Sequence, residues 1–319
     1  MKAPKFWETN NLLAKLLSPF AKIYAKKTAD RLLVSGFKSP IPVICIGNLV
    51  AGGAGKTPVC IALAKQLFAQ GKKVHFLSSG FGGDFLQAQK VDSNDCKKYG
   101  DEAVLLAKTA PTWVGKDRSE TAVLAQTAGA EILIMDDGFQ NPTLQKDFSI
   151  IVVDGKYGFG NGRVIPAGPL REPIDVGLKR ADCVIVIGEE TAQLPNFDIP
   201  KFSANLNIFY DPFLQNEDVV AFCAIARPEK FYTSLKEKGL NIVDTISYAD
   251  HHLYSEQDLK NVLQRADKLQ AVVVTTEKDY VKIPKQLHVM LHLVKAEADI
   301  QDADKLLGMI KKIDAKNNL

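Results

Sequence analysis

Short apolar runs alternate with amphipathic segments along most of the chain. Five runs have the length and composition of buried strands: residues 43–46, 74–77, 132–135, 149–153 and 183–187. Three segments between them repeat apolar side chains at helical spacing: residues 57–70, 101–109 and 118–128. Strands that alternate with helices predict βαβ units and a doubly wound, mostly parallel sheet covered on both faces.

The pattern changes near residue 190 and predicts a second, smaller α/β domain. After a proline-containing stretch at 194–200, the expected strands lie at 202–208, 219–225, 241–246 and 272–275. The expected helices lie at 228–238 and from residue 255 onward. We therefore divide the chain into an N-terminal region (1–38), a core domain (39–195) and a smaller C-terminal domain (196–319). The helical segment from Asp302 fits either domain.

The first 38 residues combine basic and apolar side chains. Glu8 and Asp30 oppose eight basic residues, so this region carries +6 while the rest of the chain sums to −3. The basic residues are Lys2, Lys5, Lys15, Lys22, Lys26, Lys27, Arg31 and Lys38. A helix here would collect on one face Leu13, Leu16, Leu17, Phe20 and Tyr24. No apolar run approaches the ~20 residues of a spanning helix, and we expect no cleavable signal peptide.

Two interpretations fit this N-terminal segment. It is either an amphipathic helix on an anionic membrane surface or an amphipathic helix packed on the protein's own core. Trp7 and the excess of basic residues favour the membrane, because tryptophan gathers at membrane interfaces and anionic lipids attract lysine and arginine.

Composition excludes several classes of protein. With 319 residues, 46% of them hydrophobic, the chain can bury one large core or two modest ones. A charged fraction of 24% argues against disorder, and a net charge of +3 without a long basic run does not suggest nucleic-acid binding. The five cysteines lie far apart without a CxxC pair, which argues against disulfides or zinc and fits a reducing compartment.

The strongest chemical signal is a glycine-rich turn after the first predicted strand. Residues 47–57 read Gly-Asn-Leu-Val-Ala-Gly-Gly-Ala-Gly-Lys-Thr and lead into a helix that begins near Pro58. A strand, a glycine-rich turn, Lys-Thr and a helix are the context of a phosphate-binding loop. Lys56 would reach the β- and γ-phosphates, and the Thr57 hydroxyl would bind Mg²⁺. One departure is Val50, where the general pattern has glycine.

A pair of carboxylates follows a second buried strand. The apolar run 132–135 ends in Asp136, Asp137 and Gly138. An acid at the carboxyl end of a strand beside a phosphate loop typically holds Mg²⁺ directly or through water. Taken alone, the same residues would form an ordinary Asp-Gly turn, but the phosphate loop upstream favours the metal.

Six segments in a fixed order carry a family resemblance. They are Gly47-Asn48-Leu49, Gly100-Asp101-Glu102, residues 136–140, residues 163–172, Asp250-His251 and Thr276-Glu277-Lys278-Asp279. Over residues 41–284 this ordered set resembles the tetraacyldisaccharide 4′-kinases, and the N-terminal region looks like that family's membrane-associated helix. The resemblance implies an active site between two Rossmann-like units.

The resemblance also implies transfer of the ATP γ-phosphate to the 4′-hydroxyl of a tetraacylated glucosamine disaccharide 1-phosphate. By position, Asp101 and His251 would serve the acceptor hydroxyl, and Lys56 and Arg171 would stabilise phosphate charge. The implied nucleotide contacts are Val50, Ala51, Gly52, Gly53, Ala54, Gly55, Lys56, Thr57, Gln140 and Arg118. The implied Mg²⁺ contacts are Thr57, Asp136, Asp137 and Glu172. The implied lipid contacts are Asn48 and Glu102.

Several of these residues have plainer interpretations when taken alone. Asp101 and Glu102 suit the first turn of a helix, His251 suits a surface turn, and residues 163–172 suit a rigid crossover loop. For residues 276–279, contact with the nucleotide and capping of the next helix are equally open. The chemistry favours a carboxylate at Asp101, since an alcohol acceptor needs a group that takes its proton.

The sequence departs from the family at three places. The family's Ser-Arg-Gly-Tyr-Gly-Gly segment has Ser79 and Phe81 in place of arginine and tyrosine, which weakens the case for a head-group contact there. Asn141 replaces the usual histidine, and Ala103 replaces a proline. The phosphate and metal positions are intact.

The expected ligands are ATP, Mg²⁺ and a lipid disaccharide, at the cytoplasmic face of the inner membrane. We expect peripheral attachment to an anionic membrane surface, no nucleic acid and no obligate protein partner. The competing hypothesis is a membrane-associated P-loop NTPase switch that acts on a protein partner, although the GTP-specifying Asn-Lys-x-Asp pattern is absent. A third is a membrane-bound nucleotide-binding module without catalysis.

Overall fold

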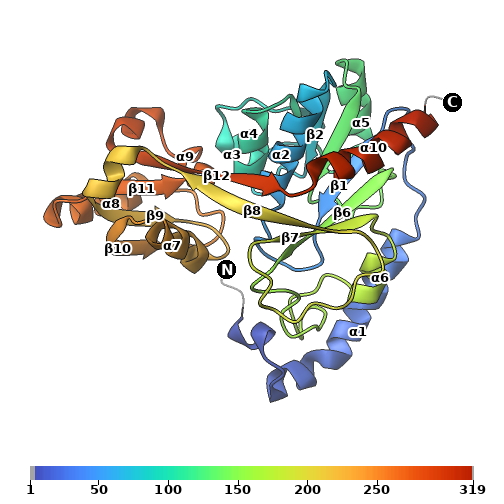
Figure 1. The fold of residues 1–319 in the computed structure, drawn as a ribbon, viewed down its shortest axis with the longest axis horizontal. Helices are drawn as coiled ribbons and strands as arrows, with labels where there is room; N and C mark the ends of the chain where they lie inside the picture. Colours follow the sequence, from blue (N-terminus) through green and yellow to red (C-terminus); the bar gives the residue numbers. More distant parts are fainter. Residues whose placement is uncertain (1–3, 318–319) are drawn as a thin grey trace.

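The computed structural model describes residues 4–317, and a single sheet of twelve strands runs through this part of the chain (Figure 1). The strand order is β10-β9-β11-β12-β8-β7-β6-β1-β5-β2-β4-β3. The strands are β1 (Val43–Gly47), β2 (Val74–Ser78), β3 (Gln89–Lys90), β4 (Thr112–Val114), β5 (Ile132–Asp136), β6 (Phe148–Asp154), β7 (Cys183–Ile187), β8 (Lys201–Phe209), β9 (Asp218–Cys223), β10 (Asn241–Ser247), β11 (Val272–Thr276) and β12 (His292–Ile300).

Helices of very different lengths connect these strands. They are η1 (Lys5–Glu8), α1 (Leu12–Leu32), α2 (Lys56–Ala69), α3 (Cys96–Tyr99), α4 (Asp101–Ala107), α5 (Arg118–Thr127), α6 (Ile174–Leu178), η2 (Pro212–Asn216), α7 (Pro228–Glu237), α8 (Glu256–Lys268), α9 (Glu277–Tyr280), η3 (Lys285–Met290) and α10 (Ala303–Asn317). Every strand pair is parallel except β8 with β12 and β3 with β4. The predicted mostly parallel α/β fold is therefore confirmed.

The core of the larger unit lies on both faces of the central strands. Strands β1, β2, β5, β6 and β7 are buried along their whole length, which explains why they read as continuous apolar runs. One face is covered by α2 and α10, whose Leu63 and Leu306 belong to the same hydrophobic cluster as Ile44. The other face is covered by α5, whose Ala122 and Ala125 pack in a second cluster. The last helix therefore returns to the larger unit.

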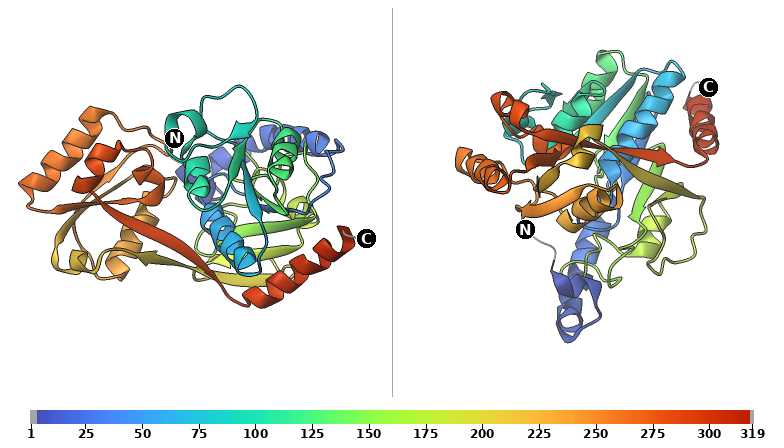
Figure 2. Two further views of the ribbon diagram at one scale, coloured as in Figure 1. Left: turned by 90° about the horizontal axis from the view of Figure 1, so that it is seen from above. Right: turned by 60° about the vertical axis from the view of Figure 1, so that its left-hand side comes forward.

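The smaller unit consists of β9, β10 and β11 between two helices. Helix α7 packs Phe231 and Leu235 on one face, and α8 packs Leu259 and Val262 on the other. We predicted the domain boundary at 195/196. Strand β8 lies after this boundary but pairs in parallel with β7, so it belongs to the sheet of the larger unit. Strand β12 pairs with both β11 and β8, so the two units share one continuous sheet (Figure 2).

Helix α1 lies against the larger unit through small side chains. Ala14, Ala21 and Thr28 are its buried residues. Its large apolar residues face outward: Leu12, Leu16, Phe20 and Ile23 are each more than half exposed. Within residues 4–317 no helix has the length and apolar character needed to cross a bilayer. The apolar face predicted from the sequence is therefore not the face that packs on the protein.

Candidate active site

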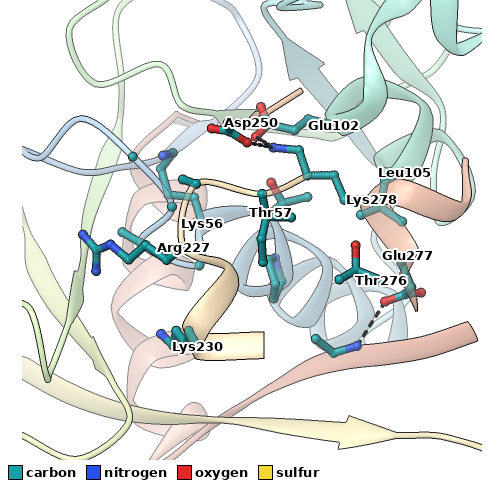
Figure 3. A pocket seen from close by; sticks show the side chains of 18 of the residues that line it. Lys56, Thr57, Glu102, Leu105, Arg227, Lys230, Asp250, Thr276, Glu277 and Lys278 are labelled. Carbon is teal, nitrogen blue, oxygen red and sulfur yellow. Dashed lines mark hydrogen bonds and ion pairs between the residues drawn. The ribbon is translucent and has the colours of Figure 1, made fainter. Parts of the chain in front are cut away.

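The two units enclose a cavity of about 540 Å³ beside the glycine-rich turn (Figure 3). The larger unit contributes residues 52–58 and Glu102, and the smaller unit contributes the start of α7, His251 and the start of α9. Apolar side chains from Leu206, Ile225 and Phe231 line the same space. A cavity with an apolar lining and a few converging charged groups is typical of a small-molecule site.

The glycine-rich turn has the backbone of a phosphate-binding loop. Gly55 precedes α2 with φ 86°, and a Cβ at this position would come within 2.6 Å of Ile187. Only glycine meets both conditions. Val50, the departure from the usual pattern, forms a bridge with Leu170 and is buried. Its extended backbone and apolar surroundings suit a β-branched side chain, so the departure leaves the loop intact.

Thr57 and Asp136 meet at the carboxyl ends of neighbouring strands. The Thr57 hydroxyl donates to Oδ2 of Asp136 over 2.9 Å, while Oδ1 is buried and has no partner among the described residues. Burial, the carboxylate of Glu102 and that of Asp137 raise the pKa of Asp136 to about 7, against the charge of Lys56. A buried carboxylate with an unused oxygen beside a hydroxyl fits Mg²⁺.

Thr57 and Asp136 would supply only part of the coordination shell of Mg²⁺. Within residues 4–317 no group of three or more histidine, cysteine or acidic side chains forms a metal cage. This agrees with the chemistry of Mg²⁺, which usually keeps waters and binds one or two carboxylates together with substrate phosphates. Thr57 and Asp136 fit that arrangement.

Asp137 is held by two cations. Arg171 makes a bidentate pair with it at 2.6 and 3.0 Å, and Nζ of Lys56 lies 3.5 Å away. Burial acts to raise the pKa of Asp137, but Lys56 and Arg171 lower it well below its usual range. Asp137 also has φ 53°, a left-handed conformation that is uncommon outside glycine. Lys56, Asp137 and Arg171 therefore form one charged group on the cavity wall.

Gln140 and Glu172 lie behind this group. Nε2 of Gln140 donates to Glu172 over 2.9 Å and to the carbonyl of Asn48 over 3.0 Å. Both oxygens of Glu172 accept from Nη2 of Arg180, at 2.6 and 2.5 Å. Glu172 is only 1% exposed and does not line the cavity. The carboxylate of Glu172 therefore pairs with Arg180 and Gln140, and the structure shows no hydrogen bond or ion pair between Glu172 and Thr57 or Asp136.

Other predicted contacts that do not line the cavity include Asn48, Val50, Ala51 and Arg118. Asn48 is fully buried, and its side chain donates to the carbonyl of Gly52 over 3.3 Å, so it supports the loop from behind. Arg118 is 4% exposed and faces a separate cavity of about 260 Å³ with Arg31, Arg171 and Gln140. Of the two predicted lipid contacts, only Glu102 lines the larger cavity.

Asp101 and His251 meet across the boundary between the units. Nδ1 of His251 lies 3.0 and 3.1 Å from the two carboxylate oxygens of Asp101. Asp101 is buried at the start of α4, whereas His251 reaches the cavity from the smaller unit. Phe81 packs edge-on against His251, with ring centroids 4.9 Å apart. The sequence analysis paired these two residues only by resemblance, and the structure brings them into contact.

The sequence left open whether Lys278 contacts the nucleotide and assigned no role to Lys282, Arg227 or Lys230. Lys278 and Lys282 of the smaller unit approach Asp101, Glu102 and His251. Arg227 and Lys230 both pair with Asp154, at the end of β6, over 3.0 and 2.8 Å. The pairs Lys278–Glu102, Arg227–Asp154 and Lys230–Asp154 each join residues more than 70 positions apart, so no local spacing could have indicated them.

Comparisons with known proteins agree with this geometry. A family model described as tetraacyldisaccharide-1-P 4′-kinase matches residues 13–313. The tetraacyldisaccharide 4′-kinase of Paramagnetospirillum magneticum is 44% identical over 317 residues, covering 96% of this chain and 97% of that protein. Its counterpart in Rhodospirillum rubrum is 45% identical over 295 residues, 89% of each chain. The crystal structure of LpxK from Aquifex aeolicus in complex with ATP has a TM-score of 0.77 at 26% identity, covering 95% of this chain and 99% of that one.

Proposed function

The chain belongs to the tetraacyldisaccharide 4′-kinase family, and we propose that it transfers the γ-phosphate of ATP to the 4′-hydroxyl of a tetraacylated glucosamine disaccharide 1-phosphate. The observation that carries this proposal is the shared cavity. A phosphate loop lines one side of it, and His251, in contact with Asp101, lines the other. A kinase needs a nucleotide site and an acceptor site that open onto the same space.

The nucleotide side supplies charge for the transferring group. Lys56 follows Gly55 at the start of α2 and faces the cavity, where it would contact the β- and γ-phosphates. Arg171 would stabilise the charge that spreads over the γ-phosphoryl oxygens. Thr57 and Asp136 would hold Mg²⁺, which when bound neutralises phosphate charge.

The acceptor side supplies a carboxylate. Asp101 would accept the proton of the 4′-hydroxyl as that oxygen attacks the γ-phosphorus atom, and the bond to the β-γ bridging oxygen breaks. Burial acts to raise the pKa of Asp101, but the hydrogen bond with His251 and the charge of Lys278 lower it. Asp101 is therefore ionised at neutral pH and available as a base, with His251 orienting it.

The outward face of α1 supports attachment to a membrane. Four large apolar side chains of this helix are more than half exposed, and the first 38 residues carry a local charge of +6. Apolar area and basic charge together are the two features that hold a helix on an anionic surface. We place the enzyme peripherally on the cytoplasmic face of the inner membrane, where a lipid acceptor would reach the cavity.

The direct test measures ADP release with and without a lipid A disaccharide precursor. A kinase releases ADP only with the acceptor and yields one phosphorylated lipid for each ADP. Lys56→Ala should keep the melting temperature and lose turnover, because the lysine charge acts on the phosphates. Acceptor-independent ADP release that a protein partner stimulates would identify a switch protein instead, and no release in any condition would identify a binding module.

A further inference from the structure

The ammonium group of Lys278 contacts both units beside Asp101 and His251. Its Nζ lies 3.0 Å from Oε1 of Glu102 in α4, 3.4 Å from Nε2 of His251 and 3.7 Å from Oδ1 of Asp250. The side chain is 19% exposed and lines the cavity. Figure 3 shows it reaching from α9 toward Glu102 and Asp250. One cation therefore contacts three groups around the site.

These contacts determine which nitrogen of His251 carries a proton. A lysine ammonium has only donors, so Nε2 must accept from Lys278. Nδ1 then carries the proton and donates it to Asp101, at 3.0 and 3.1 Å. Oδ2 of Asp250 is the competing group, 3.7 Å from Nε2, and would favour a second proton there. Lys278 is closer to Nε2, so the geometry favours the tautomer that has its proton on Nδ1, toward Asp101.

The charges around Lys278 keep it protonated. Burial acts to lower the pKa of Lys278, but the carboxylates of Glu102, Asp101 and Asp250 raise it above its ordinary value. Lys282, from the same part of the chain, is fully buried, 3.7 Å from Asp101 and 2.7 Å from Asp279. It supplies a second positive charge to Asp101 and, like Lys278, lies close to acids of both units. Of the two lysines, Lys278 is the one that contacts His251 and Glu102.

We propose that Lys278 is a positioning residue for phosphoryl transfer, which holds the His251 imidazole in register with Asp101 by pairing with Glu102 across the boundary between the units. The inference rests on the proposed kinase function. Asp101 and His251 come from different units, so their contact needs something that fixes one unit against the other. The Lys278–Glu102 pair does this next to the contact itself. Without the ammonium, His251 loses the lysine contact at Nε2 and Glu102 loses the cation that pairs with it.

The test separates the charge of Lys278 from its packing. Lys278→Met keeps most of the side-chain volume and removes the charge. Lys278→Cys can then be alkylated with 2-bromoethylamine, which restores an ammonium on a side chain that has sulfur in place of one methylene. The five native cysteines are all buried, so the reagent should modify position 278 selectively. Lys201→Met, which removes an exposed pair with Glu190, is the matched control.

We expect Lys278→Met to lower kcat with lipid acceptor by about 100-fold, the effect of a small misplacement of reacting groups, with little change in KM for ATP. Lys201→Met should behave as wild type. Aminoethylation of Lys278→Cys should recover most of the lost kcat at an unchanged melting temperature. In an Asp101→Asn background, Lys278→Met should lower kcat by less than about a further threefold, because Lys278 acts through the same Asp101–His251 pair that Asp101→Asn has already disabled.

Two results would overturn the inference. One is wild-type kcat in Lys278→Met. The other is a slow Lys278→Cys enzyme that aminoethylation does not accelerate, since the charge would then be irrelevant and only packing would remain. The aminoethylation comparison uses one polypeptide, so it holds even if Lys278→Met folds poorly. The wild-type enzyme is assayed with the lipid acceptor first. If it fails to phosphorylate the lipid, the result contradicts the proposed function itself.

Discussion

The hydroxyl of Thr57 donates to one oxygen of Asp136 over 2.9 Å and leaves the other oxygen buried without a partner. The pKa of an aspartate carboxyl in the unfolded chain is near 4, whereas burial raises the pKa of Asp136 to about 7. Between these values the folded state binds more protons, so the stability gained below pH 4 is lost as pH rises to about 7. The protein without nucleotide should therefore be less stable at pH 8 than at pH 5.

Asp136→Asn should remove that pH dependence. The amide carries no charge, so the variant should be more stable than wild type at pH 8, by more than about 1 kcal/mol since one pKa unit corresponds to about 1.4 kcal/mol. Denaturant unfolding at pH 5 and pH 8 without nucleotide gives the free energies directly. Asp267→Asn, on the exposed face of α8, is the control. A variant that keeps the wild-type pH dependence would show that Asp136 is not its source.

The contact between Asp101 and His251 predicts a strongly non-additive pair. Asp101→Asn or His251→Gln should each lower kcat by about 10²–10⁴, the usual contribution of a positioned acid–base group. The double variant should lose little more than either single variant. Steady-state kinetics at saturating ATP and lipid complete the cycle.

His252 provides the control for that cycle. It stacks on Tyr248 and pairs with Asp258, and it does not line the cavity. His252→Gln should therefore keep kcat within about threefold of wild type, because it removes no group of the site. Additive losses in the main cycle would mean that Asp101 and His251 act separately.

The pairing of Glu172 with Arg180 predicts a structural rather than catalytic cost. Arg180→Met leaves a carboxylate that is 1% exposed without its cation, and such a change costs about 3–5 kcal/mol. Adding Glu172→Gln should recover part of this loss, since the stranded charge disappears. Free energies of unfolding test both statements. Arg265→Met, an exposed arginine paired with Asp244, should cost less than about 1 kcal/mol.

A different outcome would support the assignment of Glu172 as a Mg²⁺ contact. If Arg180→Met leaves stability unchanged while Glu172→Gln weakens Mg²⁺-dependent binding of ATP, the carboxylate serves the metal and Arg180 is incidental. Isothermal titration with ATP, with and without Mg²⁺, distinguishes these results.

The outward face of α1 predicts membrane binding that is independent of folding. Replacing Leu16 and Phe20, 63% and 60% exposed, by Gln should weaken sedimentation with anionic vesicles by about 100-fold or more, because burying each side chain is worth about 1.5–3 kcal/mol. The melting temperature should not fall. Ala14→Leu and Ala21→Leu, on the packed face, should instead lower the melting temperature and leave vesicle binding unchanged. Undiminished vesicle binding by the Leu16 and Phe20 variant would contradict the proposed attachment.

Local pattern was sufficient to predict the glycine-rich turn after β1 and the carboxylate at the end of β5. The phosphate loop is contiguous, and Asp136 follows an apolar strand whose burial could be read from its composition. Strand β12 was missed because its sequence, HLVKAEADI, has no continuous apolar run and includes three charged residues. It runs between the two units, where burial depends on the whole fold rather than on the strand itself.

Local sequence pattern could not predict the contacts between distant segments. Arg171 and Glu172 are consecutive residues after the bridge residue Leu170, and the resemblance assigned them to the phosphates and the metal. In the structure Arg171 reaches Asp137, whereas Glu172 reaches Arg180. Lys278 and Glu102 are 176 residues apart, so their pairing depends on how the two units meet.

Strands β8 and β12 are adjacent and antiparallel, with Phe209 opposite Lys295, so the chain leaves the core sheet and re-enters it at neighbouring points. Residues 210–294 are thus, in topological terms, an insertion into a hairpin of the core, and insertions at such points leave the host fold intact. A protein with a short turn in their place would keep the phosphate loop, Thr57 and Asp136 but lose His251 and Lys278. The ability to bind a nucleotide and the ability to use it on an acceptor are therefore encoded in separable stretches of this gene.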